Sequence, residues 1–125
     1  MLDTDVAIHL RDRDPLVMDR VEALDEPVMI SIVTRIELEG GVHANPAVSA
    51  IRRTRLRTML ATLPTVPFGD EAADAYGAVL DAVGFSRRKV LDRMIAAQAL
   101  TLRAAVVTMN ADDFNDVPGL GVIAW

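Results

Sequence analysis

The N-terminal stretch Met1-Leu2-Asp3-Thr4-Asp5-Val6-Ala7-Ile8 determines how the rest of the chain is interpreted. We expect a strand here, only a few residues long, with Asp3 near its carboxyl end. A buried carboxylate is costly unless it is hydrogen-bonded, paired or bound to a metal, and ligands of open α/β sheets bind at the carboxyl ends of the strands. Two interpretations of Asp3-Thr4-Asp5 remain open. One is a turn whose side chains bond to the neighbouring backbone, and the other is the first part of a cation site.

The composition limits the class of protein. With 125 residues, of which 51% are hydrophobic, the chain is long enough for a single domain over 1–125 with its own core. It has no cysteine, which excludes disulfides and zinc–thiolate sites. We find no signal peptide and no apolar run of the roughly 20 residues that span a membrane. A cytoplasmic protein with no membrane association is therefore expected.

The charge pattern bears on nucleic-acid binding. A net charge of −5 and a pI of 4.9 argue against a broad basic face. However, Lys89 is the only lysine among the 13 basic residues, and the arginines cluster. The guanidinium group binds phosphate bidentately, so four arginines are candidate RNA contacts: Arg53, Arg57, Arg87 and Arg88. For Arg53 and Arg57, on an expected helix over 46–61, an ordinary solvated helix face is an equal alternative.

Strand and helix patterns alternate after the first strand. The expected helices cover residues 15–24, 33 to Gly40-Gly41, 46–61, 70–83 and 90–103. The expected strands cover residues 28–31, 63–68, 104–108 and 121–125, with a polar loop or short helical turn over 109–118. This alternation predicts a three-layer α/β domain: a short, mostly parallel sheet of four to five strands, flanked by helices on both faces.

Acidic residues recur where such a sheet would bring them to one rim. They are Asp3, Asp5, Glu37, Asp92, Asp112 and Asp113. Each of these acids has an ordinary alternative. Glu37 could be a solvated helix residue, Asp92 a negative charge that stabilises the N-terminus of its helix, and Asp112 and Asp113 plain loop acids. Several carboxylates close together repel one another unless protons or cations neutralise them. Mg²⁺ or Mn²⁺ with oxygen ligands would do so.

Four segments of the sequence carry a resemblance to a known family. They are Leu2-Asp3-Thr4-Asp5-Val6, Ser31-Ile32-Val33-Thr34-Arg35-Ile36-Glu37-Leu38, Asp92-Arg93-Met94-Ile95-Ala96-Ala97-Gln98-Ala99-Leu100, and Thr108-Met109-Asn110-Ala111-Asp112-Asp113-Phe114 with Val117-Pro118-Gly119-Leu120. Together they resemble the PIN domain, and within it the VapC-type toxins of bacterial toxin–antitoxin pairs. Each segment alone is weakly specific. Their order and spacing over residues 2–125 are specific together, and they imply a PIN-like fold.

The resemblance also implies an activity and a site. The activity is that of an Mg²⁺- or Mn²⁺-dependent endoribonuclease that cleaves RNA phosphodiester bonds with metal-activated water, forms a homodimer and is held inactive by a cognate antitoxin. Matched residue by residue, Asp3, Glu37, Asp92 and Asp113 take the places of the catalytic, metal-binding acids. Thr4, Asp5, Thr108, Asn110 and Asp112 are candidate neighbours of those acids. Asp5 replaces the family's usual asparagine, and Arg87-Arg88-Lys89 is either a substrate contact or a charged loop.

Two other functions fit parts of the sequence. Asp3-Thr4-Asp5-Val6 also matches the Asp-x-Asp motif of haloacid dehalogenase-type phosphatases, which would form a phospho-aspartate at Asp3 and need a well-placed lysine. The other alternative is a PIN-like binding module without activity. The presence of all four acids argues against that module.

Overall fold

The computed structural model describes all 125 residues. In chain order the helices and strands are α1 (Thr4–Arg11), α2 (Pro15–Glu22), β1 (Ile30–Ser31), α3 (Ile32–Ala44), α4 (Ser49–Thr62), β2 (Thr65–Val66), α5 (Asp70–Val83), α6 (Val90–Thr101), β3 (Val106–Thr108) and β4 (Val122–Ala124). Three 3₁₀ turns lie between them: η1 (Pro46–Val48), η2 (Arg87–Lys89) and η3 (Ala111–Asp113). None of the helices is both long enough and apolar enough to cross a membrane.

The strands form two parallel pairs, β1 with β2 and β3 with β4. Leu2 lies between the pairs and makes one parallel bridge to Ile30 and one to Val107. The expected sheet of four to five strands is therefore wrong, because the strands divide into two two-stranded sheets. The parallel direction and the α/β class are confirmed.

Asp3 ends the N-terminal extended segment. Its backbone N–H donates to the Val107 carbonyl (2.9 Å), whereas its side chain accepts the N–H of Thr4 (2.6 Å). A side-chain acceptor at this position satisfies a free N–H at a helix N-terminus, and α1 begins at Thr4. The expected strand is therefore wrong beyond Asp3, and α1 was not predicted.

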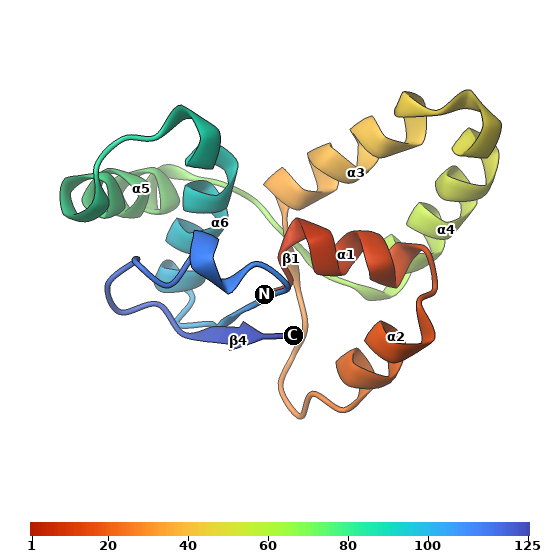
Figure 1. Cartoon of the computed structure of the whole chain (residues 1–125), viewed down its shortest axis with the longest axis horizontal. Helices are drawn as coiled ribbons and strands as arrows, with labels where there is room; N and C mark the ends of the chain where they lie inside the picture. Colours follow the sequence, from red (N-terminus) through yellow and green to blue (C-terminus); the bar gives the residue numbers. More distant parts are fainter.

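Successive strand residues face two different cores, as the alternation of side chains along a strand requires. Leu2, Ile30 and Val107 pack among α1, α2, α3 and α4. Met1 and Val106 pack against α5 and α6 on the other face. In Figure 1, α5 and α6 accordingly lie on one side of the strands, with α3 and α4 on the other. The predicted layers of helices, strands and helices are confirmed.

Helix α3 is longer than expected. It was predicted to end at Gly40-Gly41 but continues to Ala44, and it ends because Asn45 is extended in front of a proline. A Cβ atom at Gly41 would lie 3.2 Å from the Nη1 atom of Arg11, a buried residue of α1. The glycine therefore allows close approach of an arginine instead of ending the helix.

The remaining helix boundaries are close to the predicted ones. Helix α5 has the predicted bounds and ends at Gly84, which adopts a φ of 78°. Asn45 caps the turn η1, accepting the N–H of Ala47 (3.1 Å), so that α4 begins only at Ser49.

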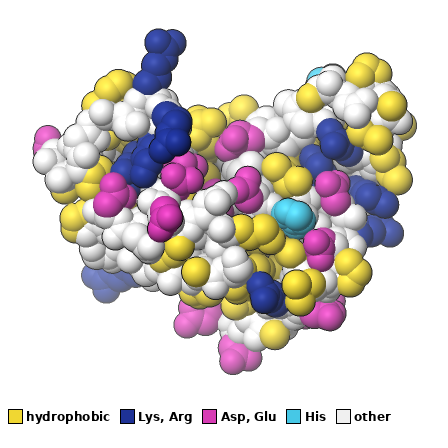
Figure 2. Space-filling model, viewed as in Figure 1, with side chains coloured by type: hydrophobic (Ala, Val, Ile, Leu, Met, Phe, Trp, Pro, Cys, Tyr) yellow, Lys and Arg dark blue, Asp and Glu magenta, His cyan; other side chains and the backbone are white.

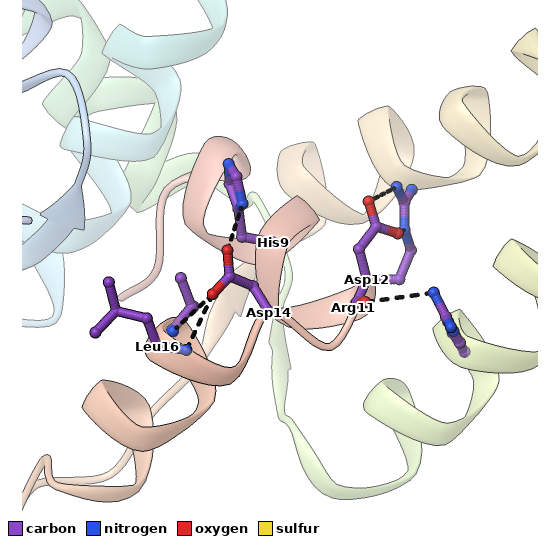
Figure 3. A network of polar contacts seen from close by, with 7 residues as sticks. His9, Arg11, Asp12, Asp14 and Leu16 are labelled. Carbon is purple, nitrogen blue, oxygen red and sulfur yellow. Dashed lines mark hydrogen bonds and ion pairs between the residues drawn. The ribbon is translucent and has the colours of Figure 1, made fainter.

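Polar contacts hold the junction between α1 and α2 (Figure 3). Asp14 accepts N–H groups from the first turn of α2 and lies 3.3 Å from Nδ1 of His9, so it caps α2. Arg11 donates from Nε to the Asp12 carboxylate (3.0 Å), and Arg55 of α4 donates to the Asp12 carbonyl (3.3 Å). These contacts join α1, α2 and α4.

Gln98 attaches α6 to the ends of the strands. The side chain is buried, and its amide nitrogen donates to the carbonyls of Val66 (3.1 Å) and Pro67 (3.0 Å). Its oxygen accepts the hydroxyl of Ser31, which in turn accepts the N–H of Val33 (2.9 Å) at the start of α3. This network fixes α6 beside the carboxyl ends of β1 and β2.

Candidate functional site

Asp3 lies at the centre of the candidate site. The residue is 4% exposed, and its carboxylate is fixed from two sides. One oxygen accepts the Thr4 N–H (2.6 Å), and the other accepts the hydroxyl of Thr108 (2.8 Å), the last residue of β3. The local turn interpretation is thus correct for one oxygen, but the second oxygen bonds across the fold.

Thr4 connects Asp3 to helix α3. Its hydroxyl donates to Oε1 of Glu37 (2.7 Å) and lies 3.1 Å from the hydroxyl of Thr34, which is fully buried. Glu37 and Thr34 are three residues apart and therefore share a helix face. This hydrogen-bonded face directs Glu37 toward the N-terminus of α1.

The segment after β3 reaches the same place. The hydroxyl of Thr108 accepts the N–H of Asn110 (2.9 Å), and the side-chain amide of Asn110 donates to the carboxylate of Asp5. The Thr108 hydroxyl thus donates to the Asp3 carboxylate and accepts the N–H of Asn110 in the loop. Thr4, Asp5, Thr108 and Asn110 all lie beside the predicted acids.

Asp92, in the first turn of α6, is affected by the charges of the other acids. Burial, together with the negative charges of Asp3, Asp113, Glu37 and Asp5, raises its pKa to about 6. The pKa of Asp3 is also raised, chiefly by burial, although its hydrogen bonds from Thr108 and Thr4 oppose the shift. In Figure 2, acidic side chains gather near the middle of the face, with Lys and Arg side chains on both sides.

Asp113 faces a cation of its own chain. One carboxylate oxygen lies 3.7 Å from Nζ of Lys89, at the end of η2. Its neighbour Asp112 is exposed and makes no side-chain hydrogen bond or ion pair. Of the two loop acids, only Asp113 is among the charges that raise the pKa of Asp92.

The donor chemistry of the cluster fits a hard divalent cation. All donors are oxygens, from carboxylates and hydroxyls, and such donors suit Mg²⁺ or Mn²⁺. In their present arrangement, no three acidic or histidine side chains converge closely enough to hold a metal ion. Two of the acids have other partners, Thr4 for Glu37 and Lys89 for Asp113.

The candidate RNA contacts differ in their surroundings. Arg53 donates to Glu39 (2.6 Å) and lies 3.2 Å from Nε2 of His43, so it is already paired with α3. Arg57 on α4 is exposed, and so are Arg87 and Arg88 in η2. These last two directly precede Lys89, the residue paired with Asp113.

Two polar residues of this region were not predicted. Arg93 is buried beside Asp92 and forms a two-point ion pair with Asp116, at 2.7 and 2.6 Å. A usable signal was present in the sequence. Arg93 is three and four residues before Ala96 and Ala97, on an apolar helix face where a buried arginine needs a partner.

Replacing Asp92 by asparagine tests the electrostatic cost of its carboxylate, which comes from burial first and from the neighbouring acids second. Because the folded-state pKa of Asp92 (about 6) exceeds its ordinary value of 3.8, the folded state binds this proton more tightly than the unfolded state. Stability of the metal-free protein should therefore fall as pH rises through that range. Asp92→Asn should raise the free energy of unfolding at pH 7.5 by on the order of 1 kcal/mol, and by much less at pH 4.

Urea unfolding in EDTA at both pH values measures this difference. The exposed Asp19 of α2 supplies the control variant Asp19→Asn, which should change neither value. An equal effect of Asp92→Asn at the two pH values would contradict the raised pKa of Asp92.

Comparison with known proteins agrees with this geometry. The PIN domain family model matches residues 1–120. Curated protein sequences offer no match. Similar solved structures include VapBC2 from Rickettsia felis bound to a promoter DNA fragment, with a TM-score of 0.87, 24% identity, and coverage of 100% of this chain and 97% of that one.

Two further structures show the same likeness. For DNA-bound VapBC from Salmonella typhimurium the TM-score is 0.85 at 24% identity, over 100% of this chain and 96% of that one. For FitAcB from Neisseria gonorrhoeae the TM-score is 0.78 at 25% identity, over 98% of this chain and 94% of that one. The likeness therefore extends over nearly the whole fold. With a family model that covers residues 1–120, the chain belongs to the PIN domain family.

Proposed function

We propose that this PIN domain is an Mg²⁺- or Mn²⁺-dependent endoribonuclease and the toxin of a toxin–antitoxin pair. The observation that carries the proposal is the group of carboxylates around Asp3: Thr4 bonds to both Asp3 and Glu37, and Thr108, at the end of β3, bonds to Asp3. Such a group is electrostatically costly in a metal-free protein. It becomes useful when a cation neutralises it beside a phosphodiester.

Four acids would hold the cation: Asp3, Glu37, Asp92 and Asp113. When bound, Mg²⁺ or Mn²⁺ would supply an activated water molecule and charge neutralisation at the scissile phosphate. The hydroxyl of Thr108 and the N–H of Thr4 orient Asp3, and the Thr4 hydroxyl orients Glu37. Because ligand carboxylates must be deprotonated, the raised pKa of Asp92 implies that cation affinity falls as pH drops below about 6.

RNA must approach a protein with a net charge of −5. Arg87 and Arg88 are exposed on η2, beside the acidic cluster, and suit this role best. Arg57 is also exposed, on α4. Arg53 would have to exchange its ion pair with Glu39 for phosphate, which makes it the weakest of the four candidates.

An antitoxin and a second copy of the chain are proposed partners. Several similar solved structures are toxin–antitoxin complexes, which motivates the first proposal. Large exposed apolar side chains remain on α2, α3 and α4 for such partners to cover, namely Leu16, Ile36 and Ile51. Action on RNA would place the protein in the cytoplasm.

Membership of the PIN family argues against the phosphatase alternative. The position of Lys89 does not favour it either, since the amine lies 3.7 Å from Asp113 and makes no ion pair with Asp3. The other alternative is a PIN-like binding module without activity, which a nuclease assay with Mn²⁺ distinguishes from an active enzyme.

Removing single carboxylates should abolish cleavage. In the presence of Mn²⁺, Asp3→Asn, Glu37→Gln and Asp92→Asn should each reduce RNA cleavage by at least about 100-fold, because each removes a proposed cation ligand and about 2.7 kcal/mol corresponds to that factor. Sequencing the cleaved ends of total RNA measures activity and target together, and circular dichroism checks the fold. Asp19→Asn is the charge-matched control. Full activity of Asp3→Asn would refute the proposed site.

The arginines of η2 should contribute to RNA affinity. In an Asp3→Asn background, Arg87→Gln with Arg88→Gln should weaken binding and flatten its dependence on salt. The slope of log affinity against log salt should fall by about 0.7 for each phosphate of single-stranded RNA that the variant no longer binds. Arg103→Gln, an exposed change beyond the far end of α6, is the control. An unchanged slope in the double variant would make Arg87 and Arg88 ordinary surface residues.

A further inference from the structure

We propose that Arg93 and Asp116 form a clamp that positions Asp113 opposite Asp92. The inference rests on the proposed function, since it concerns the geometry of the cation site. Arg93 and Asp116 touch none of the reacting groups, and they act through the loop that carries Asp113. They are therefore positioning residues and not cation ligands.

The contacts of Arg93 are specific. Its side chain is 4% exposed, and Nη1 and Nη2 donate to the two carboxylate oxygens of Asp116 at 2.7 and 2.6 Å. Nη1 also donates to the backbone carbonyl of Asp113 at 3.2 Å. A two-point arginine–carboxylate pair fixes orientation as well as distance. The guanidinium group thus holds the loop both at Asp113 itself and three residues later.

The position of the clamp links two predicted ligands. Arg93 directly follows Asp92 in the first turn of α6, whereas Asp113 and Asp116 belong to the segment after β3. Phe114 is fully buried and packs in the core beside α6, which anchors the middle of this segment. The clamp adds a second anchor on its polar side, so the carboxylates of Asp92 and Asp113 are held on rigidly connected elements.

Stability alone is a poor explanation for this pair. Arg93 is buried whereas the Asp116 side chain is 49% exposed, so the guanidinium group loses its hydration in exchange for a partner whose attraction water partly screens. Here Nε of Arg93 is buried without a hydrogen-bond partner, which adds to the cost. A geometric role explains why a charged pair with fixed orientation occupies this position.

Lys89 is the rival positioning group. It contacts Asp113 through a single ion pair at 3.7 Å. A one-point contact from a flexible lysine restrains a carboxylate less than a two-point arginine pair. Lys89 therefore provides a comparison within the same site.

The clamp is best removed from the Asp116 side. The Asp116 side chain is 49% exposed, so Asp116→Ala leaves no cavity. We expect the Mn²⁺ concentration for half of the maximal rise in melting temperature to increase about 10- to 100-fold, the usual cost of removing a partner that supports a metal ligand. With RNA and Mn²⁺, kcat should fall while KM for RNA is unchanged. Asp116→Glu, which keeps the carboxylate, should lose less Mn²⁺ affinity and less kcat than Asp116→Ala.

The controls separate positioning from folding. Asn115→Ala alters an exposed neighbour on the same loop and should match the wild type. Asp116→Ala with a lowered melting temperature but an unchanged half-saturating Mn²⁺ concentration and kcat would overturn the inference, since the pair would then be structural only. So would a loss of Mn²⁺ affinity in Lys89→Gln that is absent from Asp116→Ala. If wild-type protein neither responds to Mn²⁺ nor cleaves RNA, the proposed function itself fails and this inference with it.

Discussion

The buried carboxylate of Asp3 is the constraint on which the rest of the site depends. It is held by the Thr4 N–H and the Thr108 hydroxyl, and these two bonds join the start of α1 to the end of β3. Thr4 and Thr108 then extend the network to Glu37 and Asn110. Two uncharged donors stabilise one buried charge, but they cannot neutralise the other carboxylates of the cluster. The metal-free fold therefore retains a repulsion that a divalent cation would relieve.

Much of this arrangement could be predicted from the sequence. Alternating apolar segments indicated the three layers, because helices that cover both faces of a parallel sheet produce that alternation. The acids Asp3, Glu37, Asp92 and Asp113 could be placed near one another because each follows or accompanies a segment that ends at the same edge. The bounds of α5 were also predicted, because an amphipathic helix pattern is local and a sequence displays local chemistry most directly.

The remaining features depend on contacts between distant residues. Helix α1 was missed because Asp3 was interpreted as the end of a strand, whereas it also caps the helix that follows. Gly41 was interpreted as a helix end, but it makes room for the buried Arg11. The pairings of Arg53 with Glu39 and of Arg93 with Asp116 join elements that only the fold brings together. For the same reason, the division of the strands around Leu2 could not be read from hydropathy alone.

The central claim is that the carboxylates around Asp3 bind a divalent cation. Electron paramagnetic resonance measures it most directly, because free Mn²⁺ gives a signal that disappears when the ion binds protein. Titration of the wild-type protein at pH 7.5 should show saturable Mn²⁺ binding that Mg²⁺ competes away, and Asp3→Asn should lack that binding site. Equal Mn²⁺ binding by wild type and Asp3→Asn, or none by either, would contradict the account.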